Sequence, residues 1–190
     1  MKLVLLAAGD SRRMRGADKL LETVDGMPLL HRLALSLLQT GAGRVGVTLR
    51  PDTPARETAL DGLDVTLLPV PDAANGMSAS LRAAATWAQD QPLLVCPADM
   101  PELTAQDFAT LIAGFDGQTP ARATAQDGTP GHPVVFPAAV LPLLTGLSGD
   151  EGARSVLQRH KPRLIALPGQ HATTDLDTPE DWARWRRQTR

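Results

Sequence analysis

Short apolar runs alternate with segments of helical periodicity along the first half of the chain, and this alternation most constrains the fold. The runs cover residues 3–6, 44–49, 65–68 and 92–96, and they resemble strands that are buried on both faces. Between them, a helical stripe of leucine and alanine occupies residues 27–40, and a shorter helix is expected at 52–61. Connections this short predict right-handed crossovers and a parallel sheet that helices cover on both sides.

The second half of the chain predicts fewer strands. Further helices are expected from Ser78, which suits an N-cap, over 104–115, from 149 to about 160, and from Thr178. Strands are expected at 131–136 and 163–167, while the polar stretch 116–133 is interpreted as an excursion over the active face. With 190 residues and no repeat or linker, the chain is expected to form one α/β domain with a mostly parallel sheet.

Charge and cysteine content exclude several classes of protein. A net charge of -2 gives no general attraction to nucleic acid or to an anionic membrane, so neither is expected as a partner. Cys96 is the only cysteine, which excludes an internal disulfide and a thiolate zinc cluster, and it is expected to be a core residue. The apolar N-terminal run is too short for a signal peptide, and no stretch approaches the ~18 apolar residues of a membrane span. A cytoplasmic protein is therefore expected.

The first apolar run breaks into three small residues, Ala7, Ala8 and Gly9. A ligand can approach the main-chain N–H groups closely here, and Gly9 can adopt a positive φ if the turn requires it. The basic residues that follow are Arg12, Arg13, Arg15 and Lys19. Backbone donors followed by cations suit a polyphosphate, although a surface turn with a solvated basic run is the alternative. Neither the dinucleotide fingerprint nor a Walker A loop fits this sequence.

Asp99 follows the apolar run 92–96, just beyond the expected end of a central strand. Open α/β sheets build their sites at this edge, and Mg²⁺ is commonly held by one or two carboxylates together with substrate phosphates. The alternative is that Asp99 only caps the turn before the next helix. Because Asp99 and residues 6–19 would share one sheet edge, we favour a metal-binding role.

The stretch Leu6-Ala7-Ala8-Gly9-x-Ser11-x-Arg13-Met14, with Lys19 downstream, resembles the signature loop of the nucleotidyltransferases that activate sugars, isoprenoid precursors and molybdopterin. The resemblance implies that the backbone of this loop holds the triphosphate and the base, that Arg13 contacts the phosphates, and that Lys19 neutralises the leaving pyrophosphate. The commonest spacing in the family places glycine directly after Arg-Met; here Arg15 intervenes, and Gly16 comes one position later.

Further motifs follow in family order, from Leu3 to Trp182. A Gly-x-x-x-Ser-Leu pattern matches Gly76 and Ser80, which the resemblance assigns to the nucleotide. The same resemblance makes Asp99 the Mg²⁺-binding aspartate and Asp177 a second metal ligand. The implied fold is a Rossmann-like, three-layer α/β/α sandwich of the nucleotide-diphospho-sugar transferase type. Its nucleotide-binding part would span about 1–115 and its acceptor-binding part about 116–182.

Two segments are similar to the molybdopterin-directed, MobA-like branch. These are Gly131-His132-Pro133 and the stretch from Gly149 to Arg154, and they imply that His132 and Arg154 bind the acceptor. The Ala-Ala-Gly form of the first loop resembles the cytidylyl-transferring members, whereas the guanylyl-transferring relatives tend to carry Ala-Gly-Gly. The resemblance thus implies transfer of CMP from CTP to the terminal phosphate of molybdopterin, the organic part of the molybdenum cofactor, with Mg²⁺ as cofactor.

Other functions remain open at this point. The nucleotide would be GTP in the guanylyl branch, and the acceptor would be a sugar phosphate or another phosphorylated metabolite in other branches. A different class is a carrier or chaperone that delivers the molybdenum cofactor to a molybdoenzyme, for which the xanthine dehydrogenase type is the candidate partner. The basic and acidic residues named above argue against a purely non-catalytic protein.

Overall fold

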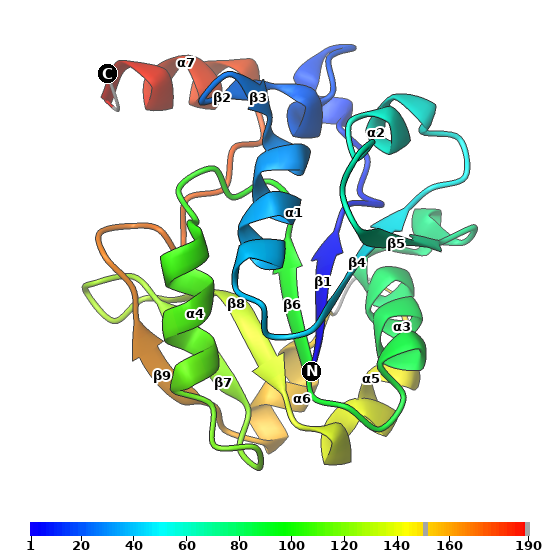
Figure 1. The fold of residues 1–190 in the computed structure, drawn as a ribbon, viewed down its shortest axis with the longest axis vertical. Coiled ribbons are helices and arrows are strands. Elements are labelled where there is room, and N and C mark those ends of the chain that lie inside the picture. The colour runs from blue at the N-terminus through cyan, green and yellow to red at the C-terminus, as the bar shows by residue number, and fades with distance from the viewer. Residues whose placement is uncertain (150–151, 189–190) are drawn as a thin grey trace.

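A computed structural model describes residues 1–149 and 152–188. Within these residues, one seven-stranded sheet has the order β5-β4-β1-β6-β8-β7-β9, and β2 and β3 form a separate two-stranded ribbon (Figure 1). The strands are β1 (Lys2–Leu6), β2 (Thr23–Val24), β3 (Met27–Pro28), β4 (Arg44–Leu49), β5 (Val65–Pro69), β6 (Leu93–Pro97), β7 (Ala121–Thr124), β8 (Pro130–Phe136) and β9 (Arg163–Ala166). The α-helices are α1 (Leu29–Gln39), α2 (Pro54–Thr58), α3 (Met77–Ala88), α4 (Ala105–Ala113), α5 (Leu141–Thr145), α6 (Arg154–Arg159) and α7 (Pro179–Gln188).

The central strand β1 explains why the sheet is covered on both faces. It pairs in parallel with β4 on one side and β6 on the other. Its side chains alternate between the faces: Leu3 and Leu5 belong to the core cluster that contains α1 and α4, and Val4 belongs to the cluster on the α3 side. The predicted α/β domain with a mostly parallel sheet is therefore confirmed.

The hairpin β7–β8 departs from the expected pattern. Residues 116–133 were interpreted as an excursion over the active face, but residues 121–124 form strand β7, which pairs antiparallel with β8 and parallel with β9. Ala121 and Ala123 are buried in the core, and the turn between the strands closes where the Ala125 N–H donates to the Thr129 carbonyl. Short alanine side chains separated by Arg122 give too weak an apolar signal to reveal this strand from sequence.

The start of α3 also differs from the expectation. Ser78 was expected to be the N-cap, but the N-cap is Gly76, with φ of 89°, and Ser78 lies buried inside the helix. The expected inner face is correct, since Leu81, Ala84, Ala85 and Ala88 are all buried. At α7, in contrast, Thr178 does cap the helix: its hydroxyl donates to the carboxylate of Asp181 and accepts from the Asp181 N–H.

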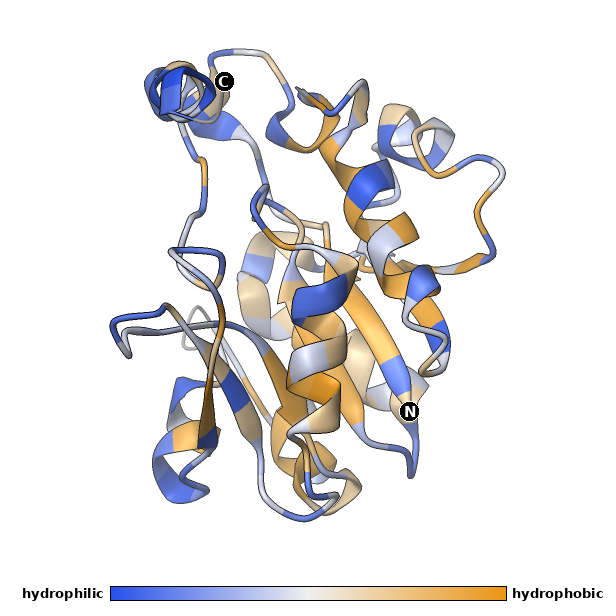
Figure 2. Ribbon diagram, turned by 60° about the vertical axis from the view of Figure 1, so that its left-hand side comes forward, coloured by the Kyte–Doolittle hydropathy of each residue, from blue (hydrophilic) through white to orange (hydrophobic). Residues whose placement is uncertain are grey.

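Apolar residues are concentrated in the central strands, and α7 is largely hydrophilic (Figure 2). Trp182 is the exception in that helix, because its side chain is buried in the core. No helix in the described part of the chain is long and apolar enough to cross a membrane.

Candidate active site at the carboxyl edge of the sheet

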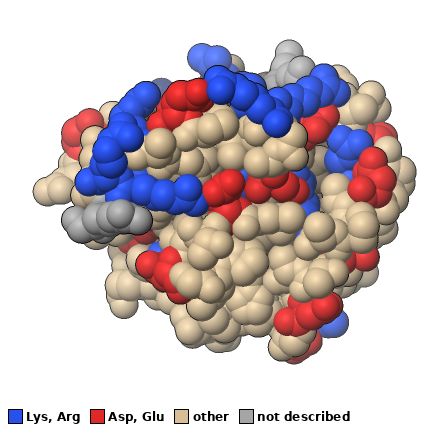
Figure 3. Space-filling view, turned by 90° about the horizontal axis from the view of Figure 1, so that it is seen from above, with Lys and Arg blue, Asp and Glu red and all other residues tan. Residues whose placement is uncertain are grey.

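The carboxyl ends of β1 and β6 bring Asp99 close to residues 7–19, which are called the basic loop below. Leu6 and Pro97 are register partners, so residues 7–19 and 98–101 leave the sheet side by side. Figure 3 looks down on this edge and shows basic and acidic side chains close together across it. A cavity of about 780 Å³ opens here. Its lining includes Leu6, Ala8, Gly9, Arg13, Lys19, Arg50, Gly76, Met77, Ser80, Asp99, Asp175 and Asp177.

The turn does not require a positive φ at Gly9. The left-handed residues are Arg15, with φ of 53°, and Gly16, with φ of 101°, at the end of a 3-10 turn over Arg12–Met14. Both residues thus have a positive φ, which glycine adopts without steric cost. This explains why a glycine is found at position 16, one position later than in the commonest family spacing. A Cβ on Gly9 would meet no atom within 4 Å, so the cavity beside that glycine is open to a ligand.

Two of the expected nucleotide-binding residues have structural contacts instead of a place in the lining of this cavity. The N–H of Ala7 donates to the backbone carbonyl and to the hydroxyl of buried Thr48, at 3.1 and 3.2 Å. Ser11 Oγ donates to Asp18 at 3.0 Å. Within the described residues, Ala7 and Ser11 thus fix the shape of the loop, while Leu6, Ala8 and Gly9 face the cavity.

Arg56 of α2 is a site residue that the sequence did not reveal. Its side chain is only 4% exposed, and its Nη1 donates to the carbonyls of Ala7 and Gly9 at 2.6 and 2.8 Å. Its Nε and Nη2 donate to the carboxylate of Asp18 at 2.6 and 3.0 Å, and Nη2 also donates to Ser11. This one guanidinium therefore holds the loop from behind. The sequence carries no signal for it, because α2 is short and matches no motif.

The environment of Asp18 depends on the same contact. Burial alone would raise the pKa of this carboxyl, but hydrogen bonds from Arg56 and from the Leu20 N–H outweigh burial and lower the pKa overall. Asp18 is consequently ionised at neutral pH, and its charge-assisted bonds to Arg56 are present there.

Lys19 joins the two carboxylates that were expected to bind metal. Its Nζ donates to Asp99 Oδ2 at 2.6 Å and to Asp177 Oδ1 at 2.7 Å. Arg13 reaches the other oxygen of Asp177 at 2.9 Å, although its side chain is 70% exposed. Burial opposes the charge on Lys19, but the neighbouring Asp99 and Asp177 outweigh it and raise the pKa of the ammonium. All four residues of this ion-pair cluster thus lie on one edge of the sheet.

The donor set of the cluster fits Mg²⁺. Asp99 Oδ1 is buried and has no hydrogen-bond partner within the described residues, so a carboxylate oxygen is available to a cation. Asp175 lies close by: burial, and then the charges of Asp99 and Asp177, raise its pKa. No group of three or more His, Cys, Asp or Glu side chains in the described ranges could hold a metal by itself. Two carboxylates that share a metal with substrate phosphates match the usual coordination of Mg²⁺.

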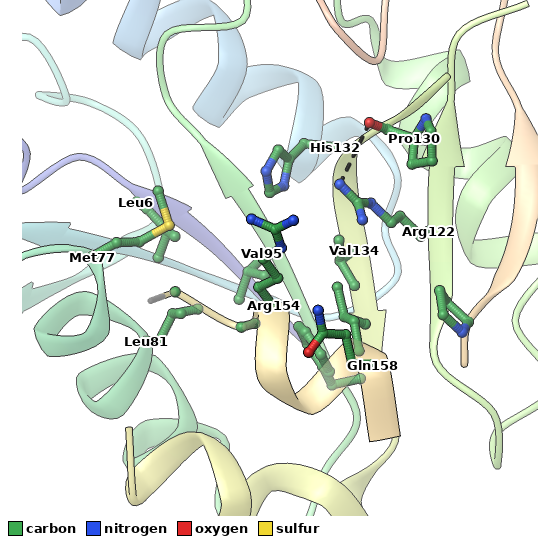
Figure 4. A pocket seen from close by; sticks show the side chains of 15 residues that line it. Leu6, Met77, Leu81, Val95, Arg122, Pro130, His132, Val134, Arg154 and Gln158 are labelled. Atoms are coloured by element: carbon green, nitrogen blue, oxygen red, sulfur yellow. Dashed lines mark hydrogen bonds between the residues drawn. The ribbon is translucent and has the colours of Figure 1, made fainter. Parts of the chain in front are cut away.

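The expected acceptor residues line a second, adjoining cavity of about 620 Å³. His132 of β8 and Arg154, the first residue of α6, point into it from different elements (Figure 4). Asp150 and Glu151 of the expected Gly149–Arg154 segment lie outside the described residues. Burial, and then the charge of Arg122, lower the pKa of His132 to about 4, so its imidazole is neutral at physiological pH. Its Nδ1 is buried and has no partner within the described residues.

Met77 and Leu6 line both cavities, so the two sites are adjacent. A smaller cavity of about 320 Å³ also connects them, since its lining includes Asp99, Met77, His132 and Arg122. Cys96 is fully buried and belongs to the core as expected; burial, and then the charge of Asp99, raise the pKa of its thiol.

The fold and this edge define an α/β nucleotide-binding protein of the nucleotidyltransferase type. Residues 3–164 match the model of the MobA-like NTP transferase domain, and the chain belongs to that family. A relative named molybdenum cofactor guanylyltransferase, from Cereibacter sphaeroides, is 31% identical over 186 residues, which are 95% of this chain and 93% of the relative. Another relative, named nicotine blue oxidoreductase, from Paenarthrobacter nicotinovorans, is 29% identical over 95% of this chain and 94% of its own length.

Solved structures agree on the fold. A protein of Mycobacterium tuberculosis H37Rv superimposes with a TM-score of 0.84 at 25% identity, covering 97% of this chain and 96% of that one. A second structure of that mycobacterial protein, described as a complex with manganese, superimposes with a TM-score of 0.75 at 25% identity, covering 96% and 95%.

Proposed function

We propose that this protein is a Mg²⁺-dependent nucleotidyltransferase of molybdenum cofactor biosynthesis, which transfers CMP from CTP to the terminal phosphate of molybdopterin and releases pyrophosphate. The proposal rests on the position of Asp99 between two cavities. Asp99 lies at the boundary between the cavity lined by the basic loop and the cavity that leads to His132. A reaction between two bound phosphates needs its charge-stabilising groups at such a boundary.

The chemistry follows from the charges at this boundary. An oxygen of the acceptor phosphate attacks the α-phosphorus of the nucleotide in line, the α–β P–O bond breaks, and its electron pair leaves with pyrophosphate. The attacking oxygen is already anionic, so no strong general base is required. Arg13 and Lys19 are assigned to the negative charge of the phosphates, as positioned cations. Asp99 and Asp177 would hold Mg²⁺, which stabilises negative charge that develops on phosphate oxygens.

CTP is our proposal for the nucleotide, and it rests on Ala8. In the Ala-Gly-Gly form of the loop this position lacks a side chain, whereas here the methyl group is buried against Val70 and Ala79 at the wall of the cavity. The Ala-Ala-Gly form of this loop resembles that of the cytidylyl-transferring members of the family, and this resemblance supports CTP. The relatives named guanylyltransferase make GTP the alternative.

A thermal-shift measurement with Mg²⁺ and each of CTP, GTP, UTP and ATP tests the nucleotide. A ligand at 100 times its Kd stabilises by about 2.7 kcal/mol, which corresponds to a Tm increase of several degrees for a chain of this size. A Mg²⁺-dependent increase with CTP alone supports the proposal. A preference for GTP overturns the choice of base, and no shift with any nucleotide overturns the nucleotidyltransferase assignment.

Asp99→Asn tests the metal-binding role. This variant removes one negative charge at the boundary between the cavities, so we expect pyrophosphate release to fall by at least 100-fold while the far-UV circular dichroism spectrum is unchanged. Near-normal turnover would overturn the assignment. Asp61→Asn, at an exposed aspartate that lines neither of the two cavities, is the matched control and should retain full activity.

Three alternatives to this proposal have their own tests. The relative named as an oxidoreductase favours a redox protein as the second candidate, and a Tm increase with NADH or NADPH in place of CTP would support it. A carrier role would appear as capture of a molybdoenzyme of the xanthine dehydrogenase type in a pull-down, without pyrophosphate release. If the protein turned over a sugar phosphate and did not turn over molybdopterin, the acceptor would be the sugar phosphate.

A further inference from the structure

A row of side chains crosses three strands beneath the second cavity. Val95 of β6 is the register partner of Val134 of β8, and Val134 is the register partner of Arg122 of β7. Residues in register on neighbouring strands share a face of the sheet, and all three line the cavity. His132, two positions from Val134 on the same strand, lines it as well. The row therefore begins with two apolar side chains, Val95 and Val134, and ends with the cation of Arg122.

Arg122 is held in place by backbone groups, and no carboxylate of residues 1–149 or 152–188 pairs with it. Its Nε donates to the Gly131 carbonyl at 2.9 Å, and its Nη2 lies 3.4 Å from the Pro130 carbonyl (Figure 4). No ion pair involving Arg122 occurs within the described residues. Burial lowers the pKa of this guanidinium, which indicates a partly desolvated cation. A fixed, desolvated cation without a counter-ion gains more from an anionic ligand than a solvated one.

Arg154 faces the same space from the opposite side. It begins α6, and its guanidinium lies in the cavity below His132 in Figure 4. Within the described part of the chain it forms no ion pair and no hydrogen bond, in contrast to Arg56 and Arg82, which contact carboxylates. Two arginines from separate elements thus present positive charge to one cavity. The rest of the lining is mainly apolar, including Leu81, Val95, Val134, Phe136 and Leu157.

Arg122 is the arginine of this pair that lies closer to the proposed reaction site. It lines the cavity of about 620 Å³ and also the smaller one of about 320 Å³, whose lining includes Asp99. Arg154, in contrast, lines the cavity of about 620 Å³ and is absent from the lining of the cavities of about 320 and 780 Å³. An anionic group that contacts Arg122 would therefore lie on the side of the cavity nearest to the metal-binding carboxylate.

We propose that Arg122 is a specificity-determining residue that binds the phosphomonoester of the acceptor, while Arg154 closes the site over a flat ring packed on Val95 and Val134. The proposal deepens the proposed function and rests on it. The ligand class is a planar heterocycle that carries a phosphomonoester. Arg122 orients the attacking phosphate, and the neutral imidazole of His132 offers its unpartnered Nδ1 to the ring.

Binding of two small probes tests this role without any nucleotide. Isothermal titration would compare 6-hydroxymethylpterin monophosphate with 6-hydroxymethylpterin, which lacks the phosphate. We expect the wild-type protein to bind the phosphorylated probe at least tenfold more tightly. Arg122→Met should abolish that preference, and Arg122→Lys should retain part of it because the charge remains. Arg163→Met is the matched control: Arg163 is exposed on the adjacent strand β9 and should leave the preference unchanged.

The outcomes separate this inference from the proposed function. An unchanged preference in Arg122→Met, or no binding of either probe to the wild-type protein, overturns the role of Arg122. Equal competition of inorganic phosphate against the phosphorylated probe in wild-type and Arg122→Met also overturns it. The nucleotide thermal shift is measured on the same variants and should not change, so a failure of the nucleotidyltransferase assignment would be visible separately. In the full reaction, Arg122→Met should raise the KM for the acceptor and leave the KM for CTP unaltered.

Discussion

Lys19 lies where a divalent cation would have to bind. Its ammonium contacts Asp99 and Asp177 at 2.6 and 2.7 Å, so the two carboxylates are neutralised by a side chain of the protein itself. A cation such as Mg²⁺ must compete with this ammonium for the same oxygens. If Mg²⁺ binds to these carboxylates as proposed, we expect Lys19 to give up these contacts and to turn to the nucleotide phosphates.

Removing this competitor should strengthen metal binding. In Lys19→Met the carboxylates lose their internal cation, and an interaction of two unit charges at this range is worth about 4 kcal/mol at an effective dielectric constant of 20. We expect the affinity for Mn²⁺, measured by EPR titration without nucleotide, to rise at least tenfold. The same variant should bind CTP more weakly.

Lys161→Met, at an exposed position, is the control for the loss of a lysine and should leave Mn²⁺ affinity unchanged. Equal or weaker Mn²⁺ binding by Lys19→Met would show that Lys19 does not compete with the cation.

His132 should remain neutral across the physiological range. Because burial and Arg122 lower its pKa to about 4, its imidazole signals in NMR spectra should not change between pH 5 and 8. The unfolded chain takes up a proton at this residue near pH 6.5, whereas the folded chain does not. The contribution of His132 to stability is therefore lost as pH falls from about 6.5 to about 4. Titration of the ring above pH 6 would contradict this account.

At the scale of elements, the basic loop is shaped by its neighbours. Arg56 of α2 holds it from behind, and the segment before and within α7 holds it from the front, where Arg15 pairs with Glu180 at 2.7 Å and Arg13 pairs with Asp177. The contacts at the front involve exposed side chains, and such pairs are individually weak. The loop is thus anchored firmly by α2 and loosely by α7, so we expect that Arg13 can exchange Asp177 for a phosphate.

Arg56→Met should destabilise the protein by about 2–4 kcal/mol, because it leaves Asp18 charged without its partner in a half-buried position. Urea unfolding would measure this effect. In the double variant Arg56→Met/Asp18→Asn the unpaired charge is also absent, so part of the stability should return. A loss for Arg56→Met within ~0.5 kcal/mol of zero would mean that Arg56 does not anchor the loop.

The same pair predicts a dependence on pH. The folded pKa of Asp18 is below its ordinary value of 3.8, so its contribution to stability is present above about pH 4 and is lost as pH falls through the folded pKa. Asp18→Asn should therefore show a smaller loss of stability in acid than the wild-type protein. Parallel curves for the two proteins would argue against this contribution.

At the scale of the whole molecule, the expected nucleotide-binding and acceptor-binding parts share one sheet and one core. Strand β8 pairs directly with β6, and Ala121, Val135 and Trp182 belong to the same buried cluster as Leu3 and Leu5. We therefore expect the chain to unfold in a single transition, although we assign its two cavities to different ligands.

A fragment of residues 1–115 tests this unity. It would expose the edge of β6 and lose part of the core, so we expect no cooperative thermal transition from it. The full chain should give one calorimetric peak, with equal calorimetric and van't Hoff enthalpies. A fragment that unfolds cooperatively would show that the nucleotide-binding part is an independent domain.

The sequence alone was enough to predict the α/β class and the order of most elements. Runs such as Leu3–Leu6 are apolar without interruption because both faces of a parallel strand are buried, and this pattern is visible in one dimension. It also determined which residues gather at the carboxyl edge, since Lys19 and Asp99 follow strands that are neighbours in the sheet.

How these residues are held, and which side chains lie opposite them, depends on contacts that form only in the folded chain. Arg56 contacts Asp18 of the loop, from which it is separated by 38 positions in the sequence. Lys19 contacts Asp177, which lies 158 positions away. Strand β7, which carries Arg122, has few apolar side chains and is a strand because β8 and β9 pair with it on either side. Contacts of this kind depend on packing between distant segments, and no local pattern of residue types records them.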